Sequence, residues 1–442
     1  MIPSTIEQIA RVEDRYVAAF ERLGPQYLNG STTVERLREE AIESFAERGL
    51  PTQKNEAWKY TNIQRVFRHE YVLEHEAETQ GGVQTIEPER IPGLDAHVVV
   101  LINGHFIPEL SDLKRLPQGV IVEGFYDAVK KWPDLISRHH GRYADPRSNA
   151  LTALNTAFAR NGLFVLVPQD LIVQRPLHVV NLLSADQEVL MQPRMLIVIE
   201  SNAKLQIVET TRARSTIRTL TNAVTEVYAA PGAHLEHYRV QDPGHSAAQV
   251  NDLQVYQERD SAVTTATITL SGALIRNNVS FLLDAEGCES HLYGLFLGRG
   301  QSHIDSHTFV DHARPNCVSN ELYKGILEDE ATGVFNGKVY VRPNAQKTNA
   351  YQSNRCIVLS PRARMYSKPE LEIYADDVKC SHGATTGQLD PEALFYLRSR
   401  GLSERLARAL LLQAFARDVV DRIRIEPVRE MLSQYVVNRY HD

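Results

Sequence analysis

Asn202-Ala203-Lys204-Leu205, Gly232-Ala233-His234-Leu235 and Asp260-Ser261-Ala262-Val263 repeat one short pattern. Each unit places a residue that is common in turns before a small residue and the start of a β-rich run. Successive units begin 30 and then 28 residues apart. This is the spacing of a β-solenoid, in which each coil of the chain stacks its strands on the coil before. The repeat therefore predicts a parallel β-helix.

The same pattern extends over residues 163–387, where no segment shows convincing helical periodicity. The alternative fold is a large antiparallel sandwich, which would carry frequent Asn-Gly hairpin signals. This block contains only Asn336-Gly337, so we favour the β-helix. The strands predicted from runs of Val, Ile, Leu, Thr and Tyr include Phe164–Val167, Leu177–Leu182, Met195–Ile199, Lys204–Glu209, Ala223–Tyr228, His234–Val240, Ala262–Leu270, Val279–Leu283, His291–Leu297 and Lys338–Val341.

Helices are expected before the β block. A capping box at Ser4-x-x-Glu7 begins a helix that ends at Gly24, and a second helix runs from about Thr33 to Gly49. A shorter apolar pattern predicts a helix over residues 149–160. Trp58 lies among charged residues and could belong to a recognition surface, but we expect it to pack beneath the helical hairpin.

Helices are also expected after the β block. Asp390-Pro391 supplies an N-cap and a first-turn proline, Ser403 caps a longer helix, and a last amphipathic stretch runs from Val428 to about Tyr440. This tail could dock another chain or form an ordinary bundle. We therefore predict a mainly β protein with three regions, which are a helical and mixed region over 1–162, a parallel β-helix over 163–387 and a helical domain over 388–442.

Composition and charge exclude several classes of protein. The chain of 442 residues is 43% hydrophobic and 23% charged, as in ordinary globular proteins. Its net charge of −7 gives no electrostatic footprint for nucleic acid. No apolar run approaches the ~18 residues that span a bilayer, and the first residues do not resemble a signal peptide. We expect a cytoplasmic location, with neither nucleic acid nor membrane as a partner.

The four cysteines are Cys288, Cys317, Cys356 and Cys380, and none forms a CxxC motif. This usage fits a reducing compartment rather than a disulfide framework. We interpret the first three as buried side chains. Cys380 precedes His382 by two residues, so in a strand both would face the same side. A thiolate and an imidazole suit iron, zinc, copper or a persulfide, but two ligands do not make a site. The local pattern by itself favours a buried cysteine beside a hydrogen-bonded histidine.

Other candidate motifs do not predict an enzyme. Residues 333–339 are one residue too short for a phosphate-binding loop and end in valine. His303, Asp305 and His307 share one strand face, where they could hold a metal, but we expect a ladder of polar side chains. Glycosidase or lyase chemistry on a β-helix would require clustered carboxylates, and the only nearby pair here is Asp305 with Asp311. A β-solenoid enzyme such as a polysaccharide lyase or an acyltransferase is the alternative to a non-enzymatic protein.

Several motifs together resemble one known family. The densest reads Asp376-Asp-Val-Lys-Cys-Ser-His-Gly-Ala-Thr385, and the others are Leu50–Thr61, Gly333–Val339, Gln346–Ala350, Ser367–Ile373 and Leu394–Gly401. Over nearly the whole chain this resembles the SufB/SufD family of iron–sulfur cluster assembly proteins. The Val-Lys-Cys-Ser-His sequence resembles the SufD branch of that family.

The resemblance implies a right-handed parallel β-helix between helical regions, and a scaffold subunit of a SufBCD-type complex rather than an enzyme. It implies pairing with a SufB paralogue through the β-helix, docking of the SufC ATPase on the C-terminal helices, and sulfur supplied indirectly by a cysteine desulfurase. A transient iron–sulfur cluster would form at the SufB interface, with none stably bound to the isolated chain. His382 and Cys380 then become the candidate ligands, shared with the partner chain, and no residue is catalytic. Without SufB, the isolated chain could pair with a second copy as a homodimer.

Overall fold

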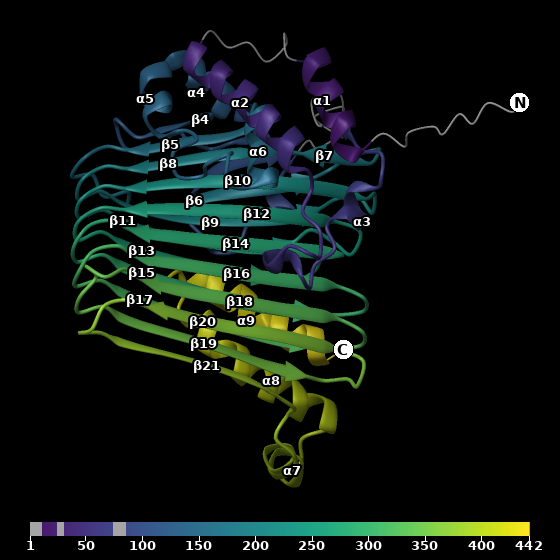
Figure 1. Cartoon of the computed structure of the whole chain (residues 1–442). Helices are drawn as coiled ribbons and strands as arrows, with labels where there is room; N and C mark the ends of the chain where they lie inside the picture. The colour runs from purple at the N-terminus through teal and green to yellow at the C-terminus, as the bar shows by residue number, and fades with distance from the viewer. Residues whose placement is uncertain (1–10, 24–30, 74–84, 442) are drawn as a thin grey trace, which may run out of the picture.

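The computed structural model describes residues 11–23, 31–73 and 85–441. Two largely parallel sheets face each other in a β-solenoid of about eight turns, with N-terminal helices over the first turns and C-terminal helices packed mainly against one face (Figure 1). The predicted mainly β fold is therefore confirmed. Strands also occur before residue 163. They include β2 (His97–Ile102) and β4 (Ile121–Gly124), each of which pairs with a strand of the first turn. The division of the chain at residues 162 and 163 stays a prediction. In the described ranges, no helix is both long and apolar enough to cross a membrane.

Sheet A contains strands from alternate positions in the chain, and the short β1 (Val72–Leu73) and β7 (Val189–Met191) lie at its margin. Its main order starts at the last turn and ends at the first. In that order the strands are β20 (Arg364–Ile373), β18 (Thr332–Val341), β16 (His303–His312), β14 (Leu274–Leu283), β12 (Ala248–Gln257), β10 (Thr219–Ala229), β8 (Arg194–Ile199), β5 (Gly162–Val167) and β4 (Ile121–Gly124).

Sheet B lies opposite and is built in the same way. Its strands, again from the last turn, are β21 (Lys379–Gly387), β19 (Asn349–Val358), β17 (Val318–Leu327), β15 (Glu289–Gly298), β13 (Ala262–Thr269), β11 (His234–Asp242), β9 (Lys204–Ala213), β6 (Leu177–Leu183), β2 (His97–Ile102) and β3 (His105–Phe106).

The repeat that predicted the solenoid forms one of its corners. Lys204 pairs with His234, and His234 pairs with Ala262, so the three units stack in register. Asn202, Gly232 and Asp260 have φ values of 59°, 70° and 57°, a left-handed conformation that Gly, Asn and Asp adopt most readily. The small residue that follows each of them is fully buried. Asn336-Gly337 lies inside β18 rather than in a hairpin, which removes the one signal for a sandwich.

The N-terminal helices cover the first turns of the solenoid (Figure 1). Trp58 is only 7% exposed and belongs to an apolar cluster with Phe45 and Leu50, so its predicted packing is confirmed. The predicted helix start at Ser4 lies outside the described residues. The helices are α1 (Val12–Leu23), α2 (Thr32–Arg48), α3 (Gln64–Phe67), α4 (Phe125–Lys131), α5 (Pro133–His139) and α6 (Ala150–Phe158), together with short 3₁₀ turns at Glu56–Trp58, Glu87–Glu89 and Pro108–Leu110.

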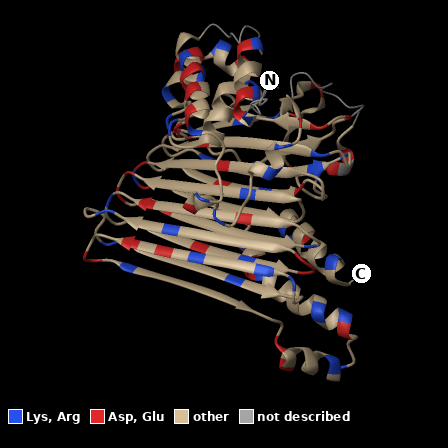
Figure 2. Ribbon diagram, turned by 45° about the vertical axis from the view of Figure 1, so that its right-hand side comes forward, with Lys and Arg blue, Asp and Glu red and all other residues tan. Residues whose placement is uncertain are grey.

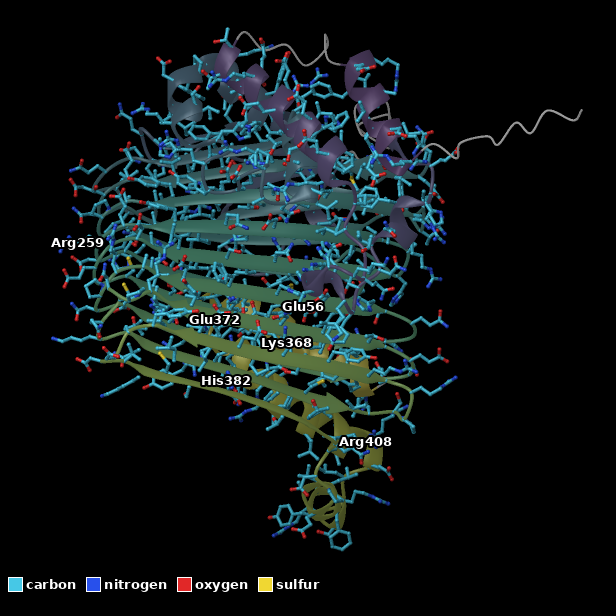
Figure 3. The ribbon with its side chains drawn as sticks, viewed as in Figure 1. Glu56, Arg259, Lys368, Glu372, His382 and Arg408 are labelled. Atoms are coloured by element: carbon cyan, nitrogen blue, oxygen red, sulfur yellow. The ribbon has the colours of Figure 1, made fainter. Side chains whose placement is uncertain are left out.

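Residues 56–60 extend from the N-terminal region to the last turn. Figure 3 shows Glu56 beside Lys368 of β20, and their ion pair measures 2.8 Å. The ring of Tyr60 stacks on that of Tyr366, with 4.5 Å between the ring centroids. Charges of both signs are interspersed along the nearby strands (Figure 2). The N-terminal region is thus tied to the strand that neighbours β21.

The C-terminal helices are α7 (Pro391–Ser399), α8 (Glu404–Val420) and α9 (Glu426–His441). Both predicted caps are confirmed, since Asp390 accepts a hydrogen bond from the amide of Glu392 and Ser403 accepts one from Leu406. Helices α8 and α9 pack on the outer face of sheet B, where Leu412 and Val428 join one apolar cluster with Leu295. Helix α7 has no buried residue and projects from the body (Figure 1).

Candidate functional site

The last turn of the solenoid is open. Within the described chain, β20 and β21 each pair with a strand on one side only. They span 10 and 9 residues, and most of their side chains are partly or fully exposed. Figure 1 places this end of the stack opposite the N-terminal helices. A long strand with an unpaired edge is a template for another strand, so this end is suited to contact another chain.

Cys380 and His382 lie on this open strand. Cys380 pairs in register with Ala350, and His382 pairs with Gln352, so both continue inward-facing columns of sheet B. Cys380 is partly buried against an apolar cluster that includes Val339. Burial raises the pKa of the Cys380 thiol, which is therefore protonated near neutral pH. His382 is exposed at the margin of the sheet (Figure 3).

A buried polar column leads to His382 from inside the solenoid. Glu321 of β17 pairs in register with Gln352 of β19, and Gln352 pairs with His382. The Gln352 amide donates a 3.2 Å hydrogen bond to Glu321, and the Thr308 hydroxyl donates another to the same carboxyl group. A Cβ at position 337 would lie only 2.5 Å from the Gln352 nitrogen, so Gly337 makes room for this cluster. The polar column thus ends at the exposed histidine.

The carboxyl group of Glu321 makes stability depend on pH. Burial raises its pKa to about 7, although the Thr308 and Gln352 hydrogen bonds oppose the shift. In the unfolded chain the group titrates near 4.5. Between these two pH values the unfolded chain releases a proton that the folded chain keeps. The contribution of Glu321 to the free energy of unfolding is therefore expected to fall as pH rises, by about 3 kcal/mol, and the fall ends above pH 7.

Glu321→Gln cannot ionise, and we expect it to lack this fall in stability. Urea unfolding at pH 5 and pH 8, followed by circular dichroism, measures the difference for the wild type and the variant. Glu289→Gln changes an exposed residue and should keep the wild-type dependence. If Glu321→Gln lost as much stability between the two pH values as the wild type does, Glu321 would not carry the effect.

A groove that His382 borders opens on the outer face of sheet B, opposite to the face of the polar column, and is closed on its other side by the end of α8. Its volume is about 910 Å³. His291 and Tyr293 stack in parallel on one wall, with ring centroids 6.2 Å apart, and Asp418 and Arg422 of the helical tail form the other wall. Lys324 links these walls, because its ammonium group contacts Asp418 and the carbonyl of Phe415. The site is therefore adjacent to the C-terminal helices as well as to the open edge.

The other histidine cluster predicted from sequence forms a polar network. Thr61 contacts both Asp305, at 2.5 Å, and the ring of His303, at 2.8 Å. Asp305 also pairs with His307 at 3.0 Å and with the Arg276 guanidinium at 2.7 Å. The expected polar ladder is confirmed, and it holds the segment that contains Thr61 against sheet A.

Neither the carboxylates nor the metal-binding side chains form a complete site. Asp305 and Asp311 are both paired with arginine, the latter with Arg342 at 2.7 Å, so they do not form a free acid–base pair. Among the described residues, no group of three or more His, Cys, Asp or Glu side chains is placed to hold a metal ion. Cys380 and His382 can therefore supply only part of a ligand set.

Family models match most of the chain. The model described as "SufBD protein N-terminal region" matches residues 11–179, and "SUF system FeS cluster assembly, SufBD core domain" matches residues 181–415. The second match alone covers more than half of the 442 residues. The chain belongs to the SufBD family of iron–sulfur cluster assembly proteins. The resemblance inferred from the sequence motifs is confirmed.

Individual members of the SufBD family align over most of their length. A SufBD family protein of Synechocystis sp. is 32% identical over 90% of this chain and 89% of its own. The iron–sulfur cluster assembly protein SufD of Escherichia coli is 28% identical over 88% of this chain and 89% of its own. SufD of Bacillus subtilis is 29% identical over 71% of this chain and 72% of its own. Similarity to SufD thus extends over most of the chain.

Sequence reasoning missed the polar column behind His382. Glu321 and Gln352 lie in β17 and β19 and carry no motif that marks them as functional. The repeat length could have found them, because Gln352 precedes His382 by 30 residues and follows Glu321 by 31. Each of these intervals corresponds to one turn of the solenoid.

Proposed function

We propose that this SufBD family protein is a scaffold subunit of a SufBCD-type complex. It pairs with a SufB-type paralogue through the open end of the solenoid, and a SufC-type ATPase docks on its C-terminal helices. An iron–sulfur cluster is the cargo and forms between the two solenoids. His382 contributes an iron ligand, and Cys380 supports it or handles sulfur. The observation that carries this proposal is the open last turn, which presents Cys380 and His382 at its free edge.

Pairing with a similar solenoid would satisfy the free edges of both sheets. Each unpaired edge leaves backbone N–H and C=O groups that a neighbouring strand can bond. A partner of similar fold offers strands of similar length at the same sheet spacing. Such a partner would also bring its own side chains to the incomplete ligand set of Cys380 and His382. Such pairing would explain why one chain carries only part of the ligand set.

Helix α7 supports docking of a further subunit. Phe395 and Tyr396 are 73% and 57% exposed, and α7 buries no residue within this chain. Large aromatic side chains are frequent anchors of protein interfaces. The sequence carries no phosphate-binding loop of its own, so nucleotide hydrolysis would belong to the docked subunit.

The proximity of the helices to His382 suggests how hydrolysis could act on the site. About eight residues separate His382 from Pro391, and the groove beside His382 is walled by the end of α8. Movement of the docked ATPase would pull on α7 and α8 and shift the edge of sheet B. The chain itself would then be a non-enzymatic subunit that transmits this movement within a cytoplasmic assembly complex.

Phe395→Asp combined with Tyr396→Asp should weaken ATPase binding by at least about tenfold, because the two charges would replace apolar anchors. Titration calorimetry with the purified ATPase measures the change. Ile172→Asp alters another exposed apolar residue, 48% exposed, and should bind normally. Unchanged affinity of the double variant would place the ATPase elsewhere.

Co-expression with candidate SufB-type and SufC-type chains tests the proposal as a whole. Affinity capture of this chain should recover both partners, and the complex should contain iron and acid-labile sulfide. Sedimentation equilibrium of the isolated chain would show whether two copies pair in the absence of the paralogue. Failure to capture either partner would remove the scaffold role proposed here.

A further inference from the structure

Two buried cysteines meet at a corner of the solenoid. Cys288 and Cys317 occupy equivalent positions in successive turns, and the amide of Val318 donates a 2.9 Å hydrogen bond to the carbonyl of Cys288. Both side chains are fully buried. The same position holds Ala203, Ala233 and Ser261 in the preceding turns, and Thr348 and Val378 in the following ones.

The two sulfur atoms converge on one acceptor. The Cys288 Sγ lies 3.1 Å from the carbonyl oxygen of Ala285, and the Cys317 Sγ lies 3.2 Å from the same oxygen. Neighbouring strands in a sheet are about 4.7–4.9 Å apart, and disulfides bridge Cα atoms about 4.4–6.8 Å apart. The backbone positions therefore allow a bond between the two sulfurs.

A buried histidine faces the pair. His312 is fully buried, and its Nε2 lies 2.9 Å from the hydroxyl of Ser319. Its Nδ1 has no hydrogen-bond partner in the described structure, although it is buried. The neighbouring Cys288 thiol and the nearby His312 ring lower the pKa of the Cys317 thiol, against the effect of burial. The hydrogen bond to Cys317, together with burial, raises the pKa of Cys288. Cys317 is therefore the more readily ionised thiol of the pair.

We propose that Cys288 and Cys317 form an oxidation site that hydrogen peroxide converts to a disulfide. The Cys317 thiolate attacks one peroxide oxygen, the O–O bond breaks, and Cys317 sulfenic acid and hydroxide result. The Cys288 thiol then attacks the sulfenic sulfur, which forms the disulfide and releases water. Peroxide gains two electrons, and the two sulfurs lose them. The product links β15 to β17, two turns before the open strand β21.

The buried Cys317 directly follows an exposed turn of the chain. Arg314 and Asn316 in the same turn are exposed on either side of Pro315, and Cys317 follows directly. Only local opening of this turn is needed, rather than unfolding of the solenoid. Oxidation is expected to be slower than at a surface thiol, and selective because it ends in a bond between two specific residues.

The remaining cysteines are internal controls. Cys356 is 3% exposed, and burial raises its pKa to about 12. Cys380 is more exposed, but burial also raises its pKa. Neither has the hydrogen-bonded thiol and facing histidine that distinguish Cys317. Peroxide should therefore leave no intramolecular disulfide at either residue.

Peptide mapping of peroxide-treated full-length protein tests the site. Cys288 lies in the tryptic peptide of residues 277–299, and Cys317 lies in that of residues 300–324. After treatment, alkylation and digestion, the two should appear as one linked species that dithiothreitol separates. Cys356→Ser should form it to the same extent, and Cys288→Ser should not form it. Serine already occupies the equivalent position 261, so the Cys288 variant is expected to fold.

A count of free thiols tests the proposal without proteolytic digestion. The number of thiols that react with Ellman's reagent after denaturation should fall from four to two on oxidation, and should return to four with dithiothreitol. The proposal is overturned if peroxide treatment that lowers the thiol count to two yields no species that links residues 277–299 to residues 300–324. It is equally overturned if the thiol count of Cys288→Ser falls by two on the same treatment.

Discussion

Glu226→Ala is expected to lower the free energy of unfolding by about 3–5 kcal/mol, because it leaves a buried arginine without its counter-ion. The carboxyl group of Glu226 and the guanidinium of Arg194 form an ion pair in which both side chains are fully buried. Burial alone would raise the pKa of Glu226, but Arg194 and His140 hold it well below its usual value. The carboxyl group of Glu226 is therefore ionised near neutral pH.

Glu226 also fixes the loop that follows α5. Its oxygens accept hydrogen bonds from the backbone amides of Gly141, Tyr143 and Ala144, at 2.9, 2.9 and 3.0 Å. Alanine would remove these acceptors as well as the charge. We therefore expect trypsin to cut after Arg142 faster in the variant, because the loop loses its attachment to β10. Urea unfolding followed by circular dichroism measures the global effect, and timed digestion measures the local one.

A surface ion pair provides the control. Glu123 contacts Lys131 at 2.5 Å, but the lysine side chain is 54% exposed. Glu123→Ala should therefore cost less than about 1 kcal/mol. Adding Arg194→Met to Glu226→Ala should recover part of the loss, since no unpaired charge remains buried. If Glu226→Ala lowered the free energy of unfolding by less than about 1 kcal/mol, the importance assigned to the Glu226–Arg194 pair would be contradicted.

Local chemistry explains why much of the fold could be predicted from the sequence. The corner repeat depends on a left-handed residue followed by a small buried one, and both preferences are visible at Asn202-Ala203 and Asp260-Ser261. The caps at Asp390 and Ser403 are likewise contacts within three residues. Alternation along a strand was sufficient to place Cys380 and His382 on one face.

Contacts between distant residues could not be predicted in this way. Thr61 reaches His303 and Asp305 across more than 240 residues, and no local pattern specifies that pairing. Cys288 and Cys317 were predicted only as buried, because their meeting depends on the register between turns of unequal length. The spacing between paired residues varies from 26, at Ala248↔Leu274, to 32, at Thr332↔Arg364. A fixed repeat therefore loses register after a few turns.

His382→Ala is expected to reduce the iron and acid-labile sulfide of the co-expressed complex by at least about tenfold. In the proposed function, His382 is the side chain that this chain extends toward the cargo, and no other residue of the exposed strand β21 carries an imidazole. The Cys380 thiol is partly buried and its pKa is raised, so it is a weaker ligand near neutral pH. Cys380→Ala should therefore reduce cluster content less than His382→Ala.

Two controls distinguish a ligand role of His382 from a structural role. His382 is exposed and makes no apolar core contact, so alanine should leave the thermal unfolding midpoint of the isolated chain and the capture of both partners unchanged. Ser381→Ala alters the neighbouring exposed residue on the opposite face of β21 and should retain the cluster. Loss of cluster together with loss of partner capture would instead make His382 an interface contact. A normal cluster content in His382→Ala would remove the histidine from the assembly mechanism.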